Sequence, residues 1–106
     1  MANIGGSASI APTPGATVTI TLNTDVHTMV ASWTAGQAET VNLSGTQKAG
    51  QHLVLVILND GTIRVITLGT GLVGNGIITG IVSKTSVLSF ISDGTNFYEM
   101  SRTVGI

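Results

Sequence analysis

The chain has no cysteine and very little charge, and both absences exclude whole classes of function. Its 106 residues include four Lys or Arg and five Asp or Glu, which leaves a net charge of −1. Without cysteine there is no disulfide framework, no thiolate nucleophile and no cysteine-ligated zinc site. Four scattered basic residues form no basic patch, so we expect no nucleic-acid partner. Charged residues are 8% of the chain, against about 25% in an average domain, which favours a protein that functions inside an assembly.

Long apolar runs and a targeting segment are also missing. No stretch reaches the roughly 20 apolar residues of a membrane-spanning helix, and the N-terminus lacks the positive start and apolar run of a signal peptide. We therefore expect synthesis in the cytoplasm and no membrane partner. The length indicates one domain. Small residues, glycine and two prolines predict that residues 1–16 form a flexible arm, so that residues 17–106 form a single β domain.

Apolar and polar residues alternate along most of the chain, with the period of a half-buried strand. The clearest case is residues 17–22, where three threonines alternate with Val18, Ile20 and Leu22. Gly, Asn and Asp turns separate the segments, and no segment predicts a helix. We expect an all-β fold of about eight antiparallel strands, a small β-sandwich or barrel that is jelly-roll-like. The other expected strands span residues 27–33, 39–43, 53–58, 63–68, 77–82, 87–91 and 97–102.

Residues 50–68 form the most apolar and best-bounded stretch of the chain. Asp60-Gly61 lies between two apolar runs and predicts a β-hairpin with a type I′ turn. The run of six apolar residues before it offers no face to solvent, so both of its faces must be buried. We expect one face in the core, and the other either under the opposite sheet or in a subunit interface. The first face comprises Leu53, Leu55 and Ile57, and the second comprises Val54, Val56 and Leu58.

A glycine-rich segment, residues 69–74, matches the dinucleotide-binding pattern G-x-G-x-x-G. That pattern binds a pyrophosphate only where it opens a helix, because the helix N-terminus holds the phosphates. Residues 75–80 are rich in glycine and β-branched residues, which do not sustain a helix. We therefore expect no nucleotide and no other cofactor.

The titratable residues form no recognisable catalytic or metal-binding set. Asp25 and His27 are two residues apart, a spacing that on a strand would place both on one face, but a zinc site needs three or four ligands. Asp60 and Asp93 are explained by turns, which leaves Glu99 alone where a glycosidase needs two carboxylates. The chain also lacks the Gly-x-Ser-x-Gly motif of hydrolases. We expect no bound metal and no enzymatic activity.

The C-terminal sequence carries a resemblance. Residues 88–102 read LSFISDGTNFYEMSR, and they resemble the closing hairpin of many tailed-phage virion proteins. In those proteins an apolar strand runs into Asp-Gly-Thr-Asn and then aromatic-Tyr-Glu-apolar-Ser-Arg, although Phe97 stands where tryptophan is usual. The Gly50-Gln51 entry to an apolar strand is similar to the same module, so the resemblance covers residues 50–102. Such modules occur in capsid decoration (cement) proteins, head fibres, and the ends of tail fibres and tailspikes, and they are commonly trimeric.

The resemblance implies a virion protein that decorates and stabilises the phage capsid as a homotrimer, with the major capsid protein as its partner. The alternative is a receptor-binding tip or tail-fibre module that binds host glycan, for which only Trp33, Phe97 and Tyr98 could supply an aromatic platform. The expected contacts are Val54, Val56 and Leu58 at the subunit interface and Ile4 and Ile10 at the capsid.

Overall fold

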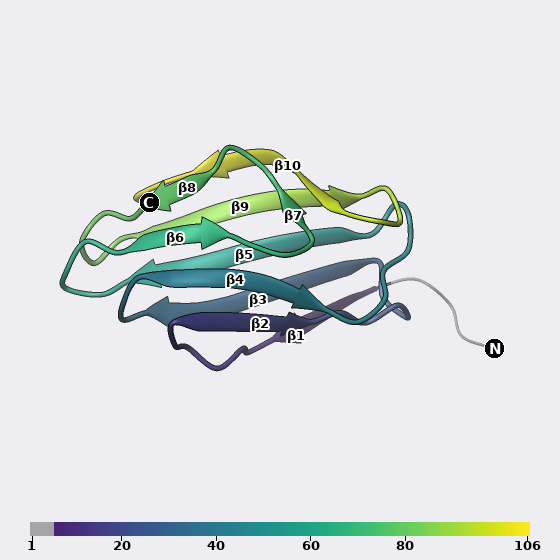
Figure 1. Ribbon diagram of the computed structural model, residues 1–106, viewed down its shortest axis with the longest axis horizontal. Helices are drawn as coiled ribbons and strands as arrows, with labels where there is room; N and C mark the ends of the chain where they lie inside the picture. The colour runs from purple at the N-terminus through teal and green to yellow at the C-terminus, as the bar shows by residue number, and fades with distance from the viewer. Residues whose placement is uncertain (1–5) are drawn as a thin grey trace.

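Ten strands in two sheets form the fold of residues 6–106, which are the residues that the computed structural model describes (Figure 1). These residues contain no helix, and so none that could cross a membrane. The six-stranded sheet comprises, in spatial order, β1 (Ser7–Ile10), β3 (Thr28–Ala35), β5 (His52–Asn59), β9 (Thr85–Ser92), β10 (Phe97–Thr103) and β7 (Leu72–Val73). The four-stranded sheet comprises β2 (Thr17–Thr21), β4 (Glu39–Ser44), β6 (Val65–Leu68) and β8 (Ile77–Thr79).

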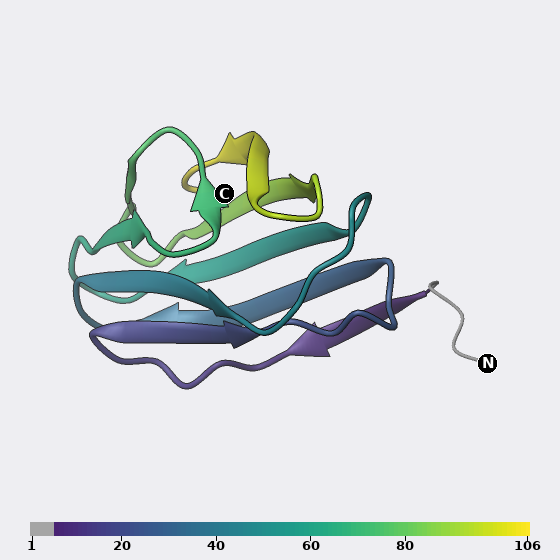
Figure 2. The same cartoon turned by 45° about the vertical axis from the view of Figure 1, so that its right-hand side comes forward.

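From β1 to β6 the chain winds back and forth between the two sheets. β1, β3 and β5 are parallel neighbours in one sheet, with Thr28 opposite both Ser7 and His52. β2, β4 and β6 are parallel neighbours in the other, with Thr40 opposite both Thr17 and Thr67. One strand from each sheet therefore makes one turn of a flattened coil: β1 with β2, β3 with β4, and β5 with β6. The two layers of this solenoid-like arrangement are visible in Figures 1 and 2. The last strands close the coil by antiparallel pairing of β8 with β6, β9 with β5 and β10 with β9.

This topology confirms the expected all-β fold but corrects the expected arrangement of its strands. The predicted jelly-roll-like arrangement of antiparallel strands is wrong, because the pairings of β1 with β3, β3 with β5, β2 with β4, β4 with β6 and β7 with β10 are parallel. Alternation of apolar residues reveals which side chains face the core. It has the same period in parallel and antiparallel strands, so it does not reveal which strands become neighbours.

The predicted hairpin across Asp60-Gly61 is also wrong. β5 lies in the six-stranded sheet and β6 in the other, so residues 60–64 carry the chain across the sandwich. Gly61 is not among the glycines with positive φ, which a type I′ turn requires. Instead, Asp60 accepts the N–H of Thr62 at 3.1 Å and forms an ion pair with Arg64 at 2.8 Å, and these contacts shape the connection.

The core fills the space between the two sheets. Leu53 and Leu55 are fully buried and Ile57 nearly so, which confirms the predicted core face of β5. They meet the inward residues of the opposite sheet, and Phe90 and Phe97 extend the core towards the C-terminal strands. The remaining fully buried apolar residues are Val18, Ile20, Met29, Ala31, Ala35, Val41, Ile78 and Leu88.

The predicted arm of residues 1–16 contains a strand. Ser7–Ile10 forms β1, which pairs with β3, and Ile10 is partly buried against the core. This part of the arm therefore belongs to the β domain. Ile4, the other predicted capsid contact, lies outside the described residues.

Two buried amide side chains fix the ends of β5. Before the strand, Gln51 donates to the carbonyls of Asn23 and Val26, both at 2.8 Å, and accepts the N–H of Lys48 at 2.7 Å. At its end, Asn59 donates to the carbonyls of Asp60 and Thr62 at 3.0 and 2.6 Å, and accepts the N–H of Arg64 at 3.0 Å. Each amide thus satisfies three backbone groups of the connections that join the two sheets.

A close approach explains Gly80, for which the sequence predicts a bulge or a close approach in a strand over residues 77–82. β8 ends at Thr79, and Gly80 is buried directly against the Asn59 side chain. A Cβ at position 80 would overlap that amide. The glycine therefore leaves room for the side chain that holds the connection after β5.

Candidate interaction surface

The outward face of the six-stranded sheet is apolar along its centre. Strand β5 contributes the second face predicted from the sequence, Val54, Val56 and Leu58. These side chains point away from the core and are half-buried to exposed. The strands β3, β9 and β10 extend this surface sideways. We call it the outer apolar face, and it comprises Val30, Val54, Val56, Leu58, Val87, Ile91 and Tyr98.

The register of the strands makes the outer apolar face continuous. Val54 lies beside Val30 of β3, and Val56 lies beside Val87 of β9. At its borders, Leu58 is 41% exposed and Tyr98 is 41% exposed. Among residues 6–106 no strand covers this face, because the four-stranded sheet packs on the opposite side (Figure 2). Of the two predicted locations for Val54, Val56 and Leu58, the one under the opposite sheet is therefore excluded, and the subunit interface stays a prediction.

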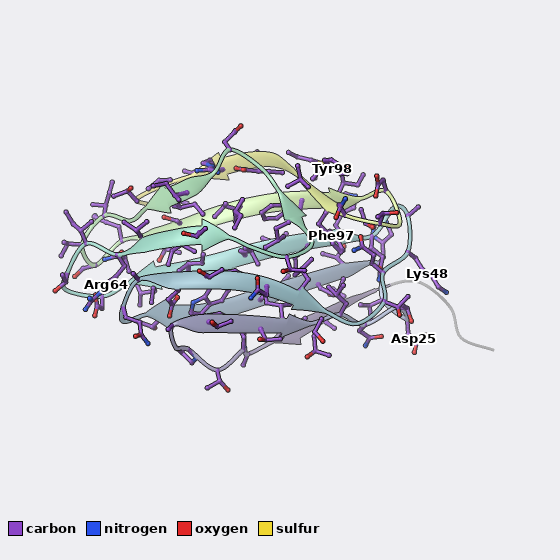
Figure 3. The ribbon with its side chains drawn as sticks, in the orientation of Figure 1. Asp25, Lys48, Arg64, Phe97 and Tyr98 are labelled. Carbon is purple, nitrogen blue, oxygen red and sulfur yellow. The ribbon has the colours of Figure 1, made fainter. Side chains whose placement is uncertain are left out.

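No Asp, Glu, Lys or Arg projects from this face within the described strands. The outward residues between the apolar side chains are small and polar, such as Ser32 and Ser89. Figure 3 shows Asp25 and Lys48 at one end of the sandwich and Arg64 at the other, while Glu39 is buried and Glu99 pairs with Arg102 within β10. A broad sheet face without charge offers no barrier to close contact with another surface.

The outward face of the four-stranded sheet is different. Thr17, Thr40 and Thr67 follow one another across β2, β4 and β6 in register, and Thr19 lies beside Asn42. Hydroxyl and amide groups at these positions bond to water, so the β2 and β4 part of this face is solvated. Val65 and Ile77 are exposed apolar residues on its β6 and β8 part. The two faces of the sandwich therefore differ in chemistry, and the outer apolar face is the candidate for a permanent contact.

The carboxylates considered from the sequence are held by local contacts. Asp93 accepts the N–H groups of Thr95 and Asn96 at 2.8 and 2.9 Å, which lowers the pKa of its carboxyl. Glu99 binds Arg102 at 2.5 and 2.7 Å and accepts the N–H of Asn75 at 3.0 Å. These contacts, with the Arg102 hydrogen bonds foremost, lower the pKa of Glu99. Asp93 thus shapes its own turn, and Glu99 connects β10 to the loop at Asn75.

Glu99 provides a test of its structural role through pH. Because its pKa is lowered in the folded state, its stabilisation is present above the unfolded carboxyl pKa of about 4.3 and is lost as pH falls through the folded value. We expect Glu99→Gln to be less stable than the parent near neutral pH and equally stable in strong acid. Urea unfolding from neutral to acid pH measures this, with the exposed Asp25→Asn as the control. Parallel stability curves for the parent and Glu99→Gln would contradict it.

Histidine and tryptophan side chains also have defined positions. The rings of His27 and His52 lie 5.0 Å apart at one end of the outer apolar face, and no group of three metal-binding side chains forms in the described part of the chain. Trp33 is buried and donates its Nε1–H to Oε1 of Glu39 at 2.8 Å. The inward Glu39 is a buried polar residue that the sequence analysis missed, since its acid side chain predicts exposure.

The aromatic platform that the receptor-binding alternative requires is not assembled. Trp33 is 6% exposed and Phe97 is fully buried, so both are core residues. Tyr98 alone of the three is exposed. The described residues also form no pocket that could hold a small ligand.

No family model, no curated protein and no solved structure matches the chain. A function has therefore to be inferred from the surface itself. What the geometry offers is a two-layered scaffold with an apolar, uncharged outer face on one sheet and a threonine-rich outer face on the other.

Proposed function

We propose that this chain is a structural protein of a tailed-phage virion, a capsid decoration protein that binds the major capsid protein lattice as a homotrimer. The observation that carries the proposal is the outer apolar face, which is continuous, uncharged and uncovered by the described residues. The sequence resemblance over residues 50–102 supplies the phage context.

In this proposal three copies turn their outer apolar faces towards a common axis. Val54 and Val56 lie at the centre of the sheet and become fully buried, while Leu58 and Tyr98 close the borders. Removal of apolar surface from water contributes roughly 25 cal/mol for each Å², so a broad face of this kind supports a stable contact. The absence of charge on the face means that no ion has to be desolvated.

A trimer has an advantage on a symmetric shell. Three linked contacts with neighbouring coat subunits bind far more tightly than one, since the second and third contacts form at a high effective concentration. Contacts that span neighbouring coat subunits then resist the internal pressure of the packaged genome. Ile4 and Ile10 stay the proposed capsid contacts, with Ile10 at the edge of the six-stranded sheet in β1.

The proposal is tested on the purified protein and on the particle. Light scattering is expected to give at least the mass of three 10.8 kDa chains, and electron microscopy of intact virions is expected to show threefold clusters over the whole shell. Binding of the purified protein to emptied capsids gives the affinity directly. A monomer mass at micromolar concentration, or failure to bind capsids, would contradict the proposal.

A receptor-binding tip is the second candidate. The observation that favours it is the exposed Tyr98, which lies beside the exposed Ile91 on the outer apolar face. An exposed tyrosine next to an apolar residue is a common contact in binding surfaces. The location in the virion separates the two candidates, because a tip protein occurs in few copies confined to the tail.

A further inference from the structure

The N-terminal end of the sandwich is a double edge. β1 is the edge strand of the six-stranded sheet and β2 is the edge strand of the four-stranded sheet, and both lie on the same side of the molecule (Figure 1). β2 pairs only with β4 among the described residues. An edge strand presents a row of unpaired backbone groups to any chain that can pair with it.

The hydrogen bonds of β2 show which backbone groups are free. The carbonyl of Ala16 accepts the N–H of Thr40 at 2.9 Å, and Leu22 donates its N–H to the carbonyl of Ser44 at 2.8 Å. In a parallel pair both backbone groups of one residue point to the same side, so alternate residues between these bonds face β4. The residues whose N–H and C=O groups point to the free edge are Thr17, Thr19 and Thr21.

Nothing in β2 protects this edge. The strand contains no lysine, no proline and no bulge, the devices by which proteins block pairing at an edge. The opposite edge of the same sheet is different, because β8 has only three residues and the carbonyl of Ile77 accepts Nη1 of Arg102 at 2.9 Å. Head-to-tail stacking of β2 on β8 of another copy is therefore disfavoured. Among the contacts that two copies could make through the edges of this sheet, the pairing of β2 with β2 therefore remains.

We propose that β2 is a self-pairing edge, at which a second copy of this chain joins antiparallel about a twofold axis through Thr19. In this register Thr17 lies opposite Thr21 of the second copy, and Thr19 lies opposite its own counterpart. Each of the three residues whose backbone groups point to the edge then lies opposite such a residue of the second copy. The three pairs form about six backbone hydrogen bonds. The threonine side chains become cross-strand neighbours on the solvated face, a favourable pairing. The self-complementary register is the reason for assigning a second copy as the partner.

This contact is independent of the proposed function. It uses a strand edge of the four-stranded sheet and leaves the outer apolar face free, so it operates with or without trimers. Alone it gives a dimer, and together with the proposed threefold contact it links one trimer to the next. Variants in β2 therefore act on the twofold contact, whereas variants on the outer apolar face act on the threefold contact.

A single-cysteine variant tests the register directly, because the chain contains no other cysteine. Residues directly opposite in an antiparallel pair lie about 5.5 Å apart at Cα, which is within the range of a disulfide. We expect Thr19→Cys to form a covalent dimer rapidly with oxidised glutathione. The matched control is Thr67→Cys, which projects from the same sheet face but lies on the inner strand β6. Equal cross-linking of the two variants, or none at Thr19→Cys, would overturn the proposal.

A proline variant tests the backbone bonds. The N–H of Thr19 points away from β4, so Thr19→Pro removes no bond within the subunit, and proline is tolerated at such edge positions. In the pair it removes both central donors, and we expect the dimer dissociation constant to rise roughly 100-fold. Sedimentation over a range of concentrations measures this, with circular dichroism to verify folding. If Thr19→Pro does not fold, Thr19→Lys with Thr67→Lys as control gives the same comparison. An unchanged dissociation constant, or a parent without a twofold contact, would overturn the proposal.

Discussion

Val56→Asp is expected to disrupt the proposed threefold contact while the subunits stay folded, as monomers or as dimers joined through β2. Val56 lies at the centre of the outer apolar face, between Ser32 of β3 and Val87 of β9. In the monomer its side chain borders solvent, so an aspartate there stays hydrated and the fold is retained at a cost of about 1 kcal/mol. In the proposed trimer three carboxylates would be buried together near the axis without a cationic partner.

The expected weakening of the trimer is at least roughly 100-fold, because each buried unpaired carboxylate costs several kcal/mol and 1.4 kcal/mol corresponds to a factor of ten. Light scattering gives the mass, and circular dichroism verifies the fold. Val65→Asp is the matched control, since Val65 is 37% exposed on the outward face of the four-stranded sheet. A trimer that withstands Val56→Asp, or is lost equally with Val65→Asp, would show that the outer apolar face is not the threefold contact.

Gln51→Leu is expected to cause a large loss of stability. The Gln51 side chain is almost completely buried, and it bonds the carbonyls of Asn23 and Val26 and the N–H of Lys48. Leucine fills a similar volume but bonds none of these groups. Three backbone groups would then lose their partners in the space where the β2–β3 turn meets the entry to β5.

We expect the free energy of unfolding to fall by about 3–5 kcal/mol, since each unsatisfied backbone group costs roughly 1–3 kcal/mol and some regain water. Urea unfolding of the parent and the variant measures this. Gln37→Leu is the control, because Gln37 is exposed and forms no side-chain hydrogen bond within residues 6–106, so it should change stability by less than about 0.5 kcal/mol. Equal effects of the two substitutions would contradict the assigned role of Gln51.

Several features of the fold could be predicted from the sequence. Alternation in residues 17–22 indicates the inward Val18 and Ile20, and both are fully buried. The uninterrupted apolar run in residues 53–58 indicates a strand with two apolar faces, and the structure places one face in the core, while residues 6–106 do not cover the other. These inferences succeed because the period of side chains along a strand is a local property.

The topology could not be predicted in this way. Asp60 does begin a turn, but the chain then leaves the sheet instead of returning beside β5. The buried polar residues Gln51, Asn59 and Glu39 are not indicated by the sequence, because their residue types predict exposure. Their burial depends on hydrogen-bond partners that only the folded chain brings into position, such as the distant carbonyls of Asn23 and Val26 for Gln51.

The same distinction applies to the two surfaces proposed for association. The sequence alone shows that Val54, Val56 and Leu58 form an apolar set distinct from the predicted core face. It also shows that the chain carries little charge to oppose association through such a set. The fold shows that residues 6–106 leave this set uncovered and that β2 is an edge strand without a second partner among them. Side-chain period and charge are local properties of the sequence. The neighbours of a strand depend instead on packing between segments that are far apart in the sequence.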